Sequence, residues 1–192
     1  MKNSVLILLI LSAWGTAYGE DSVPAHPHVR VETTQGTFVL ELEGKRAPLT
    51  VRYFLSLVDS GRYDGTIFHR VMPGFMIQGG GYTPDLNARK SANTIPNESG
   101  NGLSNTYGTI AMARTSDPHS ASAQFFVNVA DNMQLNPGPG SWGYAVFGYV
   151  IEGMDVVDKI ATIRTGPAGK FRKDVPIVPV VIEKMSRVVY DD

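Results

Sequence analysis

The chain has 192 residues, with 17 lysine and arginine residues against 18 aspartate and glutamate residues and a formal net charge of −1. This near-neutral balance gives no electrostatic footprint for nucleic acid or for an anionic membrane surface. The sequence contains no cysteine, which excludes disulfides, thiol nucleophiles and zinc sites of the cysteine type. Its length and near-average composition indicate one globular domain with its own hydrophobic core.

The first residues are typical of an export signal. Lys2 gives a positive start, residues 5–11 are almost all apolar, and Ala17 and Gly19 place small residues three and one positions before a cleavage point. This pattern predicts a secretory signal peptide over residues 1–19. The apolar run is too short for a transmembrane span, and no cysteine follows it, so we expect no membrane or lipid anchor.

A β-hairpin is expected to open the domain. Residues 20–28 contain two prolines and are interpreted as a flexible lead-in, and the domain itself is expected over residues 29–190. Residues 29–33 and 38–42 alternate apolar and polar side chains on either side of a turn that contains Gly36. Two alternating runs about a glycine-containing turn are typical of a hairpin.

Two amphipathic helices are expected. The first begins at Pro48, which suits the first turn of a helix, and stops near Gly61. Apolar residues recur at helical spacing in both segments. They are Val51, Phe54, Leu55 and Val58 in the first helix and Met154, Val157 and Ile160 in the second.

Short strands are expected over much of the remaining chain. Strand character is found at residues 109–113, 124–129, 144–150 and 176–189. Pro179 indicates an edge or a bulge in the last of these strands, and the polar residues 83–103 indicate a long surface loop. Seven or eight strands and two helices that do not alternate with them favour a mainly antiparallel barrel or sandwich whose open ends the helices cover.

The stretch over residues 68–81 is the most informative part of the chain. It reads as two short strands about a Pro73-Gly74 turn. Strand alternation predicts that Phe68, Arg70 and Met72 share one face, and that Arg70 and Gln78 face one groove beside Met76. A guanidinium among apolar side chains is costly without a partner, so either the protein or a ligand carbonyl is expected to supply one.

The sequence motifs of most common catalytic classes are not found in this chain. We find no phosphate-binding glycine loop and no nucleophile motif. His26 and His28 are interpreted as part of a solvated tail, and His69 as a structural histidine; we expect no metal site and no cofactor. What remains is an apolar groove with one arginine, one glutamine and several aromatic rings. The sequence therefore indicates a binding site, or a catalyst of a reaction that breaks no bond.

Residues 68–80, Phe-His-Arg-Val-Met-Pro-Gly-Phe-Met-Ile-Gln-Gly-Gly, resemble the signature of the cyclophilin-type peptidyl-prolyl cis-trans isomerases. Residues 108–114, 122–126 and 146–148 are similar to further family segments, in the same order. The resemblance covers residues 29–189 and implies an all-β fold, a closed eight-stranded antiparallel β-barrel with two capping α-helices. Together with the signal peptide, it is strongest to the periplasmic cyclophilins of Gram-negative bacteria.

The resemblance also implies roles for ten residues. Arg70 would be the catalytic arginine, and Gln78 would hydrogen-bond the substrate backbone. The residues implied to line the proline pocket are Phe75, Met76, Phe126 and Leu135, with Tyr144 where many members have a histidine. Those implied to lie along the peptide are Ala113, Arg114 and Thr115, with Arg114 used through its backbone.

The implied function is isomerisation of X-Pro bonds and assistance to the folding of exported proteins in the periplasm, by a monomer without nucleic-acid partners. Gln134 stands where the best-known eukaryotic members have a tryptophan that grips cyclosporin, and Arg114 replaces their asparagine, so weak cyclosporin binding is expected. Two alternatives stay open: a holdase-type chaperone or peptide-binding module that uses the same groove, and a sugar-binding β-barrel. Turnover of X-Pro peptides separates the first from an isomerase, and titration with sugars tests the second.

Overall fold

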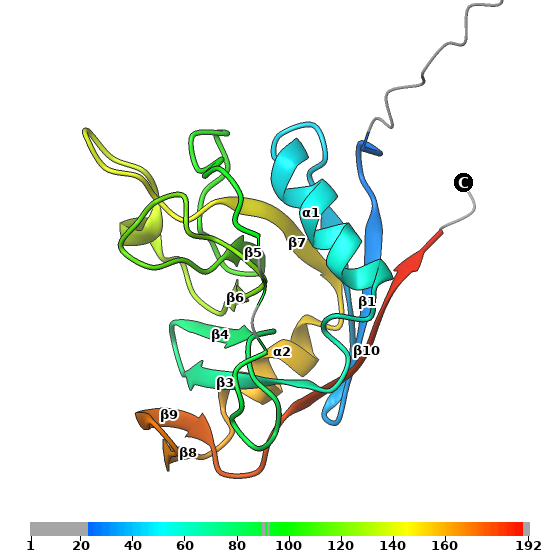
Figure 1. Ribbon diagram of the computed structural model, residues 1–192, viewed down its shortest axis with the longest axis vertical. Coiled ribbons are helices and arrows are strands. Elements are labelled where there is room, and N and C mark those ends of the chain that lie inside the picture. The colour runs from blue at the N-terminus through cyan, green and yellow to red at the C-terminus, as the bar shows by residue number, and fades with distance from the viewer. Residues whose placement is uncertain (1–22, 90, 92, 190–192) are drawn as a thin grey trace, which may run out of the picture.

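The computed structural model describes residues 23–89, 91 and 93–189, and the expected signal peptide lies outside them. Within this part of the chain, eight strands form one closed barrel in the order β1-β10-β3-β4-β6-β5-β7-β2, and every neighbouring pair is antiparallel (Figure 1). The expected antiparallel barrel is therefore confirmed, and the sandwich alternative is wrong.

The elements have the following bounds. The barrel strands are β1 (His28–Thr33), β2 (Gly36–Leu42), β3 (Thr66–Met72), β4 (Met76–Gly79), β5 (Thr109–Met112), β6 (Phe125–Asn128), β7 (Val146–Glu152) and β10 (Val181–Val188). The other elements are α1 (Pro48–Asp59), the short 3-10 helix η1 (Met133–Leu135), α2 (Met154–Ala161), β8 (Thr165–Ala168) and β9 (Phe171–Pro176). None of the helices in the described residues is long and apolar enough to cross a membrane.

The first hairpin forms as its alternation predicts. Val31 of β1 pairs with Phe38 of β2, and the apolar residues of both strands are buried in the barrel. The expected lead-in needs a correction, because its last residues are bonded to the barrel. The carbonyl oxygen of Ala25 accepts a hydrogen bond from Gly44, and His28, the first residue of β1, lies with its Nε2 atom 3.0 Å from a carboxylate oxygen of Glu41.

The two helices cover the barrel, and both begin and end close to the predicted residues (Figure 1). Their apolar faces are buried. The ring of Phe54, from α1, reaches the rings of Tyr63, Phe125 and Phe147 at centroid distances of 5.2, 5.8 and 5.0 Å. Tilted and edge-on packing of this kind adds to the free energy of burial, so the helix, the loop that follows it and two barrel strands, β6 and β7, share one core.

The C-terminal part of the chain differs from the sequence prediction. Residues 176–189 do not form one strand, because Pro176 ends β9 and β10 begins only at Val181. The strands β8 and β9 were not predicted, and they pair with each other outside the barrel as a two-stranded sheet. Figure 1 shows this hairpin beside β3, on the side away from β4. The strand expected at 144–150 begins two residues later, at Val146.

Candidate functional site: a groove beside β3 and β4

A β-bulge in β3 decides which residues face the groove. Arg70 pairs with Gln78 of β4, but Phe68 pairs with Gly79, so one extra residue, His69, stands between them. A bulge of this kind reverses the alternation of the strand. The prediction that Phe68 shares a face with Arg70 is therefore wrong: Phe68 is fully buried in the barrel core, whereas the Arg70 side chain is 43% exposed.

The pleat of β6 determines which of two adjacent phenylalanines faces the groove. Phe125 belongs to the main barrel core, and Phe126 belongs to a second, smaller cluster with Met76. Successive side chains of a strand point to opposite faces, so only one of the two rings can reach the groove. The ring of Phe126 packs edge-on against Tyr144, with centroids 5.6 Å apart.

Nine of the ten residues singled out from the sequence line one open hollow of about 400 Å³. They are Arg70, Phe75, Met76, Gln78, Ala113, Arg114, Phe126, Leu135 and Tyr144. The tenth, Thr115, lines an adjoining hollow together with Gln78, Ala113 and Arg114. A mostly apolar hollow with a few convergent polar groups is the usual form of a small-ligand or peptide pocket.

The guanidinium of Arg70 lies at this hollow rather than in the barrel interior. Its nearest ionic partner is Asp174 of β9, whose Oδ2 atom is 4.0 Å from the Arg70 Nε atom. Asp174 has a positive φ of 68°, a conformation that few residues other than glycine adopt and that aspartate tolerates. A loose contact at this distance steers the guanidinium but leaves its donors able to reach a bound ligand.

The two other polar groups of the hollow are also held by neighbours. The amide Nε2 atom of Gln78 donates a 2.9 Å hydrogen bond to Oε1 of Gln124. The side chain of Arg114 donates to the carbonyl oxygens of Trp142 and Gly143, at 2.7 and 3.2 Å, and its guanidinium lies 4.5 Å from the centre of the Tyr144 ring. The Arg114 side chain is thus part of the groove wall.

Buried asparagines, which sequence reasoning missed, connect the loops around the hollow. Asn132 donates to the carbonyl oxygen of Phe75 and to the side chain of Asn128, at 2.8 and 2.7 Å. Asn128 donates to Asn105 at 3.2 Å, and Asn105 donates to the carbonyl oxygen of Tyr144 at 3.2 Å. Because buried amides need such partners, the network ties the backbone of Phe75 and Tyr144 to one rigid frame. The only sequence signal for this network was an asparagine-rich composition, and such a composition predicts a loop.

His69 is a buried structural residue. Burial lowers its pKa to about 4, so the ring is neutral at physiological pH. The ring packs against those of Tyr82 and Phe171, at centroid distances of 4.6 and 5.6 Å. Among the described residues, no group of three or more histidine, aspartate and glutamate side chains is arranged to hold a metal ion.

The fold and the groove together define a class of protein: a closed antiparallel barrel that carries a mostly apolar hollow beside an arginine. A family model described as cyclophilin type peptidyl-prolyl cis-trans isomerase matches residues 28–186. The chain belongs to this family, and it is a peptidyl-prolyl cis-trans isomerase.

Curated relatives and solved structures agree with this assignment. The chain is 56% identical to peptidyl-prolyl cis-trans isomerase cyp18 of Streptomyces antibioticus, over 81% of this chain and 95% of that one. It is 50% identical to isomerase B of Escherichia coli, over 82% and 98% of the two chains. A cyclophilin-type isomerase of Cryptosporidium parvum has the same fold, with a TM-score of 0.70 and 26% identity over 86% of this chain and 99% of that one. The same protein solved in the presence of the dipeptide Ala-Pro gives a TM-score of 0.68, at 27% identity over the same shares of the two chains.

Proposed function

We propose that the groove beside β3 and β4 holds the X-Pro bond, with Arg70 and Gln78 as the catalytic residues, and that the enzyme assists the folding of exported proteins. The observation that carries the proposal is the convergence of an exposed guanidinium and a fixed amide on one apolar hollow. Proline-containing peptides and partly folded chains are the proposed substrates.

The reaction needs an environment that favours a twisted amide. Resonance gives the X-Pro bond a rotational barrier of ~18–20 kcal/mol. The planar amide carries more negative charge on its oxygen than the twisted amide does, so withdrawing water from that oxygen favours twisting. In the hollow, the side chains of Phe75, Met76, Phe126 and Leu135 supply the apolar wall that would receive the proline ring.

Arg70 would stabilise the twisted state directly. Twisting returns the lone pair to the proline nitrogen, which can then accept a hydrogen bond from the guanidinium. Because the guanidinium stays charged at every relevant pH, the step requires no proton transfer. The weak contact with Asp174, at 4.0 Å, lets Arg70 exchange that partner for the substrate.

Arg70 alone would not account for the rate. An acceleration of about 10⁵-fold requires the barrier to fall by ~7 kcal/mol, and one hydrogen bond to a charged group contributes about 1.5–3 kcal/mol. The rest must come from binding the twisted geometry better than either planar one. Gln78, held in place by Gln124, would grip the substrate backbone on one side of the bond. The main chain from Ala113 to Thr115 would align it on the other.

We place the enzyme in the periplasm. The support is the signal-peptide pattern of residues 1–19, which lie outside the described residues. Fusing these residues to a reporter that is active only after export tests the location. Reporter activity in the periplasm, absent when Lys2 and the apolar run are deleted, is expected.

The folding role is tested with a client whose refolding is limited by slow X-Pro isomerisation. We expect the wild-type enzyme to accelerate the slow phase at substoichiometric concentration and the Arg70→Ala variant to lose at least about 100-fold of this activity. A short X-Pro peptide is assayed in parallel, and binding of that peptide is expected to survive the substitution. Arg30→Ala, on an exposed position of β1, is the matched control and should keep full activity.

The same experiment separates the isomerase from a holdase. A holdase would suppress client aggregation only at equal or higher concentration than the client, and Arg70→Ala would not change its effect. Wild-type rates in Arg70→Ala for both client and peptide would contradict the role given to this arginine.

A further inference from the structure

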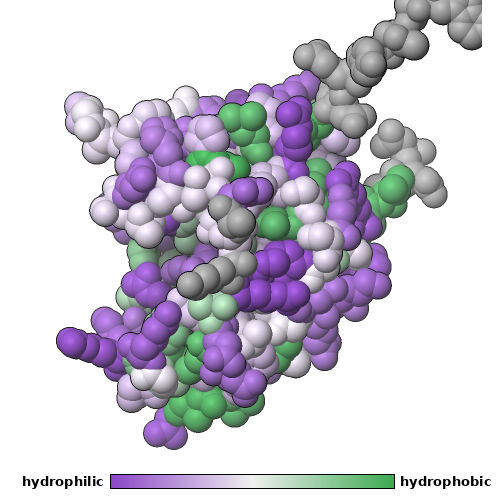
Figure 2. All heavy atoms as spheres, viewed as in Figure 1, coloured by the Kyte–Doolittle hydropathy of each residue, from purple (hydrophilic) through white to green (hydrophobic). Residues whose placement is uncertain are grey.

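The hairpin of β8 and β9 carries a concentration of positive charge that the isomerase reaction does not use. Arg164, Lys170, Arg172 and Lys173 lie within ten residues of the chain, and all four are exposed. Asp174 is the one acidic residue between positions 164 and 178. In a chain with a formal net charge of −1, such a local excess is a distinct surface feature. Figure 2 shows strongly hydrophilic side chains projecting at this corner of the molecule.

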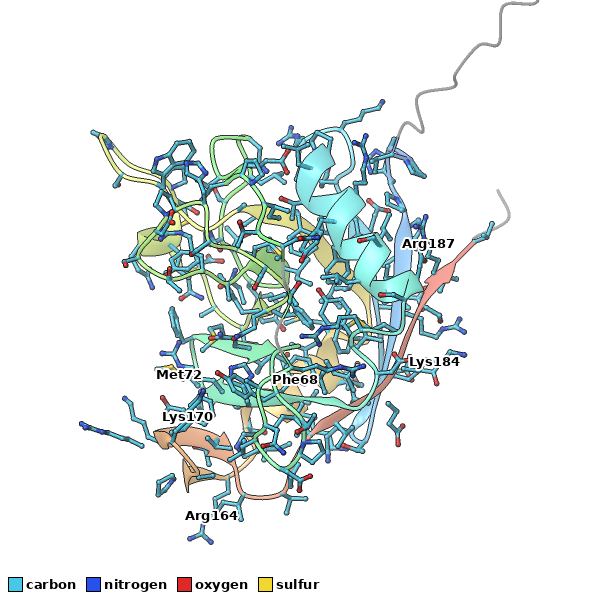
Figure 3. The ribbon with its side chains drawn as sticks, viewed as in Figure 1. Phe68, Met72, Arg164, Lys170, Lys184 and Arg187 are labelled. Carbon is cyan, nitrogen blue, oxygen red and sulfur yellow. The ribbon has the colours of Figure 1, made fainter. Side chains whose placement is uncertain are left out.

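The hairpin is fixed beside the groove by aromatic contacts. Phe171 packs against His69, from β3, and edge-on against Tyr82 at a centroid distance of 5.1 Å. The Nζ atom of Lys170 lies 4.6 Å from the centre of the Tyr82 ring. Figure 3 shows Lys170 on the same side of the molecule as Met72, the residue that ends β3 at the groove. The positive charges therefore have a defined position relative to the reaction site.

Asp174 connects this charge to Arg70. Its Oδ2 atom lies 4.0 Å from Nε of Arg70 and 3.9 Å from Nζ of Lys173, so the two nitrogen atoms are at most about 8 Å apart. One carboxylate is thus shared by two cations, and Arg172 lies on the same strand. An extended peptide advances ~3.3 Å per residue, so a side chain two or three residues from the proline would reach Lys173.

We propose that Lys170, Arg172 and Lys173 form a cationic rim that selects prolyl substrates with acidic residues within about three positions of the proline. The inference rests on the isomerase activity of the groove and adds a substrate preference to it. The rim would bind an acidic segment of the substrate chain, and the proline of that same substrate chain would lie in the hollow. The Lys173 side chain is 75% exposed, so it can turn from Asp174 to a substrate carboxylate without loss of buried structure.

The test compares three heptapeptides with one central Ala-Pro bond and glutamate, glutamine or lysine at the two positions on each side of it. We expect kcat/KM at low ionic strength to be about five-fold or more higher for the glutamate peptide than for the lysine peptide, since exposed charge pairs each contribute modestly. The preference should shrink at high salt, where the charges are screened.

The variant Arg172→Gln/Lys173→Gln should bring the ratio of the glutamate to the lysine peptide close to one. The ratio is taken within one variant, so a general loss of folded protein cancels. Lys184→Gln, on the opposite side of the molecule in Figure 3, is the control and should keep the wild-type preference. Equal rates for the three peptides, or a preference that the double variant retains, would overturn the cationic rim while leaving the isomerase intact. No turnover of the glutamine peptide would overturn the isomerase and the rim together.

Discussion

Gln134 lies in η1, next to Leu135 of the groove wall, and its side chain is exposed. Its amide donates a 3.3 Å hydrogen bond to Asn132, so it closes the end of the asparagine network and adds little apolar surface to the hollow. In related eukaryotic cyclophilins, by the resemblance described above, this position has a tryptophan that contacts cyclosporin.

We therefore expect Gln134→Trp to strengthen cyclosporin binding by about ten-fold, because an indole ring adds a large apolar contact at the edge of the hollow. Calorimetric titration measures the change. Met133→Trp, which places the same ring one residue away on the exposed side of η1, is the control and should bind as the wild type does. Unchanged affinity in Gln134→Trp would show that this loop does not align with the family as we infer.

At the scale of elements, the groove depends on loops that are held by buried amides. Asn105, Asn128 and Asn132 are all at most 3% exposed, and their hydrogen bonds end on the backbone of groove residues. A buried donor that loses its partner costs about 1–3 kcal/mol.

Asn132→Asp tests this dependence with little change of shape. The substitution places a carboxylate where an amide donates to the carbonyl oxygen of Phe75 and to Asn128, so two oxygen–oxygen contacts replace two hydrogen bonds. We expect the free energy of unfolding to fall by about 2–3 kcal/mol, and kcat/KM to fall because Phe75 loses its anchor. Asn87→Asp, at an exposed position, is the control; denaturant unfolding and the peptide assay measure both effects. Wild-type stability in Asn132→Asp would contradict the network.

The sequence predicted the barrel elements well where alternation or helical spacing extends over several residues, as in β1, β2 and α1. It failed where a single residue changes the pattern. Because of the bulge at His69, the side chain of Phe68 points into the core. No feature of the composition predicts this bulge. The hairpin of β8 and β9 contains Gly166, Pro167 and Gly169, and these residues are typical of loops.

The site residues, too, could be predicted only where a local sequence pattern marks them. Nine residues singled out from the sequence meet in one hollow. They could be identified because the family motifs occur in this sequence in the same order. Asp174, Gln124 and the asparagines were not found. Their roles depend on contacts between segments far apart in the sequence, such as the 4.0 Å approach of Asp174 to Arg70, and such contacts leave no local pattern.

At the scale of the whole molecule, the buried His69 couples stability to pH. Its pKa is lowered to about 4 by burial, whereas an unfolded chain binds the proton near the ordinary value of ~6.5. Below this ordinary value the unfolded state binds more protons than the folded state, so the stability contribution is complete above pH ~6.5 and is lost as the pH falls toward 4.

We expect acidification from pH 7 to pH 4 to lower the free energy of unfolding of the wild type by up to about 3 kcal/mol more than that of His69→Phe. The variant keeps a ring against Tyr82 and Phe171 but has no titrating group there, and carboxylates contribute equally to both proteins. Denaturant titrations at the two pH values measure the difference. Parallel pH profiles for the two proteins would contradict a neutral buried imidazole.

Closure of the barrel bears on the proposed role of the enzyme with chains that have not yet folded. An open sheet offers a row of unpaired amides onto which a nascent β-strand can attach and begin a mixed aggregate. Here each of the eight barrel strands already has a neighbour on both sides, and the accessory β8–β9 sheet outside the ring bears lysine and arginine along β9. In the proposed folding role, the barrel would therefore offer a bound client no free strand edge with which to pair.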